Sequence, residues 1–187
     1  MTPRKASLVI ICAETVVAVA TLTIHGWNIE GLQAVTRFSG RLSLLIFSLL
    51  FLFHASERID LSVIFSSRYY LMFALAHGIH LGELVSYNLL KGDLPAPYRL
   101  AGGFVAYAFI FAMPWLANRA ETGRLKTPKF RVVRTVYFYY ILFIFFMTYF
   151  SRVFGSVPAG GTFQEHVALM GWVALLPFTK IAVHRFF

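Results

Sequence analysis

The chain has 187 residues, of which 58% are hydrophobic and only 13% are charged. Soluble domains carry about a quarter charged residues, so this composition excludes a water-soluble globule and indicates a body whose solvent is lipid. The formal charge is +9. No basic run is interleaved with aromatic residues outside the apolar segments, which argues against nucleic acid as a partner.

Six apolar stretches are each long enough to cross a hydrocarbon core, which is about 30 Å thick and takes about 20 helical residues. In chain order we expect these spans at residues 6–24, 40–55, 69–90, 100–117, 133–150 and 166–183. Inside lipid every backbone amide must be paired within its own segment, so the spans are helices rather than strands. The sequence therefore predicts a single all-α domain over residues 1–187, a polytopic bundle of six transmembrane helices.

The basic residues are divided unevenly between the two sides of this bundle. Twelve of the 17 Lys and Arg residues fall on the side of the N-terminus. The opposite side holds Arg37, Arg41, Lys91, Arg99 and Arg152. Because cytoplasmic loops carry the excess of basic residues in membrane proteins, we expect both termini in the cytoplasm.

Four costly ionisable side chains lie well inside the predicted spans. Glu14 is on the first span, and the third span reads His77-Gly-Ile-His80-Leu-Gly-Glu83. Such a side chain costs at least about 2.5 kcal/mol at the centre of a bilayer and needs a reason to be there. Residues three apart on a helix are neighbours, and the three on the third span cover roughly 120° of its surface. We therefore expect them on one face, turned into the bundle.

The residues alone leave three interpretations of this cluster open. In the first, one histidine is an axial ligand of haem b, with its other ring nitrogen held by a carboxylate or a carbonyl. In the second, His77, His80, Glu83 and Glu14 bind a metal ion or relay protons. In the third, the same groups only hydrogen-bond neighbouring helices and fix their packing. No GxGxxG, GxxxxGK[ST], HExxH or GxSxG motif points to other chemistry.

Two segments carry a resemblance to a known family. The stretch Arg37-Phe-Ser-Gly-Arg-Leu-Ser-Leu-Leu45 opens the second span, and Ser67-Arg-Tyr-Tyr-Leu-Met-Phe-Ala-Leu-Ala-His-Gly-Ile-His80 leads into the third. Both resemble the corresponding segments of the ferric reductase-like transmembrane domain, which occurs in the haem subunit of the bacterial methionine sulfoxide reductase system. The proline-containing loop that ends at Tyr98-Arg99 and the six-helix layout are also similar.

The resemblance implies a haem b site. By its distance from Arg68, His80 matches the ligand position of the family better than His77 does, and Glu83 would orient the ligand. The family places further histidines on the fifth span, and this chain has none there. Met147, at a depth similar to that of His80, is then the candidate ligand on the opposite side.

The resemblance also implies a function and a location. The chain would be an integral subunit of the bacterial cytoplasmic membrane, possessing an oxidoreductase role in which haem passes electrons across the lipid bilayer. The electrons would go to or come from a partner protein, docked at the basic segment 119–134, or a quinone. The alternative is a haem-free membrane protein, either a carrier of protons or metal ions or a scaffold subunit of a larger complex.

Overall fold

The computed structural model describes residues 2–53, 67–92, 97–155 and 160–186, and these residues are mainly helical. The helices are α1 (Pro3–His25), α2 (Ile29–Phe53), α3 (Ser67–Lys91), α4 (Pro97–Glu121), α5 (Thr127–Phe154) and α6 (Phe163–Phe186). Each predicted span falls within one of them, except that residues 54 and 55 of the second span lie outside the described residues. The described residues contain no strand, which confirms the all-α prediction.

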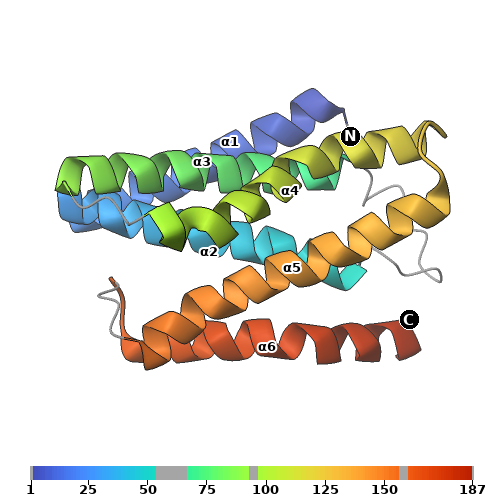
Figure 1. The fold of residues 1–187 in the computed structure, drawn as a ribbon. Helices are drawn as coiled ribbons and strands as arrows, with labels where there is room; N and C mark the ends of the chain where they lie inside the picture. The colour runs from blue at the N-terminus through green and yellow to red at the C-terminus, as the bar shows by residue number, and fades with distance from the viewer. Residues whose placement is uncertain (1, 54–66, 93–96, 156–159, 187) are drawn as a thin grey trace.

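The helices run alternately in opposite directions, so that the N- and C-termini lie at the same end of the bundle (Figure 1). Helix α2 lies between its neighbours and contacts α1, α3 and α6, while α3 packs on α4, α4 on α5 and α5 on α6. Side-chain hydrogen bonds also join different helices. Trp172 Nε1 on α6 donates to Ser48 Oγ on α2 at 3.0 Å, and Tyr140 Oη on α5 donates to the carbonyl of Gly102 on α4 at 3.0 Å.

Four helical segments in the described part of the chain are long and apolar enough to cross a membrane: Pro3–His25, Ile29–Phe53, Thr127–Phe154 and Phe163–Val183. Large apolar side chains also cover much of the outer surface, among them Leu8 on α1 and Phe143 on α5. A soluble monomer rarely exposes apolar surface on this scale. The chain is therefore an integral membrane protein whose exterior faces a lipid bilayer.

Phenylalanine rings of three helices pack together within the core. Phe47 on α2 is fully buried, and its ring centroid lies 5.5 Å from that of Phe73 on α3. On α5, Phe138 and Phe145 lie at 6.2 and 5.3 Å from the same ring. Aromatic rings at these separations pack in favourable tilted arrangements. The aromatic rings of α5 therefore pack α2, α3 and α5 together around the site described next.

The turn between α1 and α2 sets the close contact of these two helices. Helix α1 ends at His25 and is followed by Gly26, whose φ of 93° favours glycine. The side chain of Asn28 then accepts a hydrogen bond from the backbone N–H of Gly31 at 2.8 Å and caps the start of α2. A β carbon at Gly31 would overlap the carbonyl of Gly26. This tight turn brings the middle of α1 against α2 and α3.

Candidate functional site

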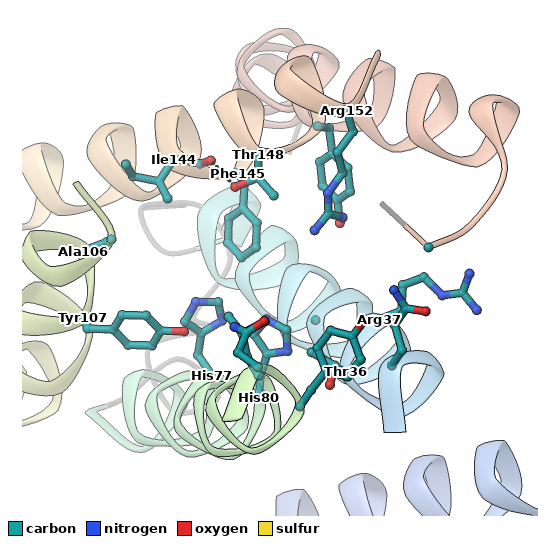
Figure 2. Close-up of a pocket in the computed structure, with 18 of the residues that line it drawn as sticks. Thr36, Arg37, His77, His80, Ala106, Tyr107, Ile144, Phe145, Thr148 and Arg152 are labelled. Carbon is teal, nitrogen blue, oxygen red and sulfur yellow. Dashed lines mark hydrogen bonds between the residues drawn. The ribbon is translucent and has the colours of Figure 1, made fainter. Parts of the chain in front are cut away.

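A cavity of about 440 Å³ lies between α2, α3, α4 and α5, towards the end of the bundle opposite the termini. It is lined by Gln33, Thr36, Arg37, Gly40, His77, His80, Leu84, Tyr87, Asn88, Lys91, Gly103, Ala106, Tyr107, Ile110, Ile141, Ile144, Phe145, Thr148, Tyr149, Arg152 and Gly160. Figure 2 shows His77 and His80 pointing from α3 into this space, with Tyr107 reaching in from α4 and Phe145 and Arg152 from α5. The two histidines singled out from the sequence thus face the same cavity.

The imidazole of His77 is enclosed by aromatic rings. Phe73 lies at 5.4 Å between ring centroids and Tyr107 at 5.1 Å, both stacked on it. Phe145 meets it edge-on at 5.6 Å, and the ring of His80 lies at 5.4 Å. Because rings from α3, α4 and α5 hold it on several sides, the His77 imidazole has little freedom to turn. Its position suits packing of the cavity floor better than ligation.

The imidazole of His80 rests against a glycine of α2. A β carbon at Gly40 would lie only 2.9 Å from His80 Cε1 and 3.3 Å from Nε2, so the ring occupies space that any other residue at position 40 would fill. The ring also lies against the backbone carbonyl of Thr36. The Nδ1 atoms of His80 and His77 are buried and have no hydrogen-bond partner among the described residues. Helix α2 therefore shapes a slot for this one side chain.

The mouth of the cavity is basic. Arg37, Lys91 and Arg152 line it, and no Asp or Glu is among the described residues that do so. Arg41 stands nearby, but its guanidinium forms a salt bridge with Glu165 at 3.0 Å. The Nε atom of Arg37 is buried without a hydrogen-bond partner among the described residues. An anionic group would therefore be attracted to this mouth.

Basic residues are few at this end of the molecule, and most of them line the cavity. Only five of the 17 Lys and Arg residues were expected on this side, and three of the five line the cavity. The side chain of Arg99 lies outside the described residues. Most basic residues lie at the end of the bundle with the termini, so these three are exceptions. Their position in the cavity lining suggests that they serve the cavity.

The two carboxyl groups of the predicted cluster do not join the histidines. Neither Glu14 nor Glu83 lines the cavity. Both lie instead beside Ser39 of α2, on the side of α3 that packs against α1. The expectation that all four groups converge on one site is therefore wrong. The physical reason is the helical twist, because each step of three residues turns the side chain by about 60°, and two steps carry Glu83 from the cavity to the contact with α1.

Met147, the ligand predicted opposite His80, is turned away from the cavity. Its side chain is 41% exposed on the outer surface of α5, and the residues of α5 that line the cavity near it are Ile144, Phe145 and Thr148. A pair of ligands formed by His80 and Met147 is therefore excluded. The prediction considered only the depth of Met147 along α5. The side chain points away from the cavity because of its direction around the helix axis.

The described residues contain no group of three or more His, Cys, Asp or Glu side chains that could hold a metal ion. This agrees with the separation of the histidines from Glu14 and Glu83. Among the described residues that line the cavity, the imidazole groups are those of His77 and His80, and both are on α3.

Several residues of the site were not predicted from the sequence. Tyr107 and Gly40 carry no charge, so nothing in the sequence marked them out. The basic residues Arg37 and Arg152 had been assigned only to loops or helix ends. A partial signal exists on α5, where Ile141, Phe145, Thr148 and Arg152 recur at helical spacing and together form its cavity face.

The residues present fit a haem b that is held through one histidine. His80 offers an imidazole in a shaped slot, and the basic mouth suits two propionate groups. The wall of α4 includes Gly103, where a β carbon would meet no atom within 4 Å, so a flat ring system would find space there. No second histidine, methionine or cysteine faces α3 across the cavity from the described residues. They therefore do not fit ligation from two opposite helices.

Comparison of the chain with protein-family models, with curated proteins and with solved structures gave no match. The proposal below therefore depends on the cavity and on the resemblance noted in the sequence.

Proposed function

We propose that this chain is a membrane subunit that holds one haem b and passes single electrons to or from a partner. The observation that carries the proposal is the imidazole of His80, seated against Gly40 and facing a cavity of about 440 Å³ whose mouth is lined by Arg37, Lys91 and Arg152. A histidine nitrogen is the common axial ligand of haem iron. Carboxylates pair strongly with guanidinium groups.

The residues of the cavity would divide the work of holding the haem. His80 would bind the iron, and the carbonyl of Thr36 beside its ring would help to hold the ring's orientation, as outer partners do for ligating histidines. Arg37 and Arg152 would bind the propionates. The aliphatic side chains of Ile141 and Ile144 would keep water from the ring system. When bound, the haem supplies a one-electron redox couple that no amino-acid side chain of this site provides.

The resemblance to the ferric reductase-like transmembrane domain supports the same proposal, with a difference in ligation. Histidines on the fifth span are missing from this chain, and Met147 faces outward. A haem bound in this cavity would therefore be held by one protein ligand, His80. With one protein ligand, such a haem would be expected to be high-spin and to bind small exogenous ligands, unlike a haem held between two histidines.

We further propose that all six helices cross the bilayer with both termini in the cytoplasm of a bacterium. The alternating directions of the helices support this arrangement. The electron donor or acceptor would be a separate protein or a quinone, because these 187 residues contain no nucleotide-binding motif. Exposed basic side chains between residues 119 and 134, at the end with the termini, are the proposed docking surface: Arg124, Lys126, Lys129 and Arg131.

A visible spectrum of the purified protein tests the haem proposal. Expression with a supply of haem precursor should give a coloured protein with a Soret band. His80→Ala should abolish the band, whereas His25→Ala should keep it, because His25 is exposed at the end of α1 and away from the cavity. A helical protein that stays colourless under these conditions would refute the proposal, as would a His80→Ala variant with an unchanged spectrum.

A further inference from the structure

A second polar site lies where α1, α2 and α3 meet, apart from the cavity. Glu14 of α1 is only 3% exposed and Ser39 of α2 is fully buried. The hydroxyl of Ser39 lies beside the carboxyl groups of both Glu14 and Glu83. Both oxygens of Glu14, one oxygen of Glu83 and the Ser39 hydroxyl are buried without a hydrogen-bond partner among the described residues. Three helices thus bring three unsatisfied polar groups to one place.

This group of side chains has more hydrogen-bond acceptors than donors. An ionised carboxylate only accepts hydrogen bonds, whereas a protonated carboxyl also donates one. With both carboxyls ionised, the three buried, unpartnered oxygens of Glu14 and Glu83 would have the single O–H of Ser39 as their nearby donor. With one proton added, the group has two donors and a carboxylate to receive them. Ser39 is buried, has no hydrogen-bond partner among the described residues and lies beside both carboxyls, so a proton on one carboxyl would supply the further donor that this group needs.

Electrostatic repulsion between the two carboxyls also favours one bound proton. Glu14 is buried and Glu83 is half-buried, and ionising two neighbouring carboxyls in such surroundings is costly, as is any unpaired buried charge. The interactions described for Glu14 and Glu83 are with Ser39 and, for Glu14, with Glu83. A single proton shared between the two carboxyls would remove one of the two negative charges.

The basic and titratable groups on the packed helices are engaged elsewhere. On α2, Arg37 lines the cavity and Arg41 is paired with Glu165. On α3, His77 and His80 face the cavity. On α1, the remaining titratable group at this depth is Cys12, which is exposed.

We infer that Glu14 and Glu83 form a proton-binding site in which the pair retains one proton at neutral pH and shares it through Ser39. The two carboxyls and the proton together carry one negative charge. This site does not depend on haem, and its test uses a different signal.

Infrared spectroscopy of the full chain in detergent provides the test, because a protonated carboxyl has a C=O stretch well separated from ionised carboxylate. At pH 7 the wild type should show this band. The double variant Glu14→Gln/Glu83→Gln, in which neutral amides replace both carboxyls, should lose it. Glu30→Gln is the matched control, since Glu30 is exposed at the start of α2, and it should leave the band unchanged.

A wild type without the band at pH 7, or a double variant that keeps it, would overturn the inference. Ser39→Ala should shift the frequency of the band by removing the shared hydroxyl, and an unshifted band would overturn the role of Ser39. Loss of the wild-type band on adding sodium at constant pH would show a cation site in place of a retained proton. The infrared measurement on the wild type tests the inference even if a variant fails to fold. It also does not require bound haem, so a protein that binds no haem could still confirm or overturn the proton site.

Discussion

Substitution of Gly40 by alanine tests the slot that α2 forms for His80. The new β carbon would lie 2.9 Å from His80 Cε1, about 0.5 Å closer than the 3.4 Å at which ordinary contact begins. The obstructing atoms belong to a ring and not to the far end of a flexible chain. The ring therefore has to move as a whole, and the side that is open to it is the cavity.

The size of the effect follows from where the overlap is relieved. In the haem-free protein the ring can turn into the cavity, so the fold should be little affected, and alanine adds up to about 1 kcal/mol of helix propensity over glycine. Haem binding requires the ring in its original place and restores the overlap. Overpacking of this kind costs about 1–3 kcal/mol, which corresponds to about 5- to 150-fold weaker haem binding.

Haem titration of the apoprotein, followed at the Soret band, measures this change. Gly82→Ala is the control on α3, because a β carbon there would meet no atom within 4 Å, and we expect wild-type affinity for it. Circular dichroism should show equal helix content in both variants. Wild-type affinity in Gly40→Ala, or equal losses in the two variants, would refute the proposed seat of His80.

Three further substitutions separate the cavity from its surroundings. Met147→Ala should leave the haem spectrum unchanged, because Met147 lies on the outer surface; an altered spectrum would restore it as a ligand. Arg152→Gln should weaken haem retention during size-exclusion chromatography by removing a charge from the mouth, and unchanged retention would count against propionate binding there. Phe47→Ala should lower the free energy of unfolding by about 3–5 kcal/mol, measured by denaturation in detergent, since four rings pack on Phe47; a loss below about 1 kcal/mol would contradict the packing described.

The helices could be predicted from the sequence because lipid leaves few choices. A long apolar stretch in a membrane has to be a helix. The limits of each apolar stretch therefore gave the approximate limits of a helix. Only the second predicted span reached beyond the described residues, at positions 54 and 55. The ends of the helices extend a few residues past the predicted spans, as expected where apolar segments pass into polar connections.

The site could be predicted only in part. His77 and His80 were correctly expected to lie together, because residues three apart on one helix are always neighbours. Met147 and Glu83 were misplaced because the rotation of a side chain around its helix depends on how the helix packs. Tyr107 comes from a different helix and carries no charge, so only the packing of α3 against α4 reveals its contact with His77.

The amount and spin state of bound haem test the central claim most directly. Purified protein, assayed for haem by the pyridine haemochrome method and examined by electron paramagnetic resonance in the oxidised state, should contain one high-spin haem per chain. His80→Ala should contain none. A folded protein without haem, or a low-spin haem that persists in His80→Ala, would contradict the account.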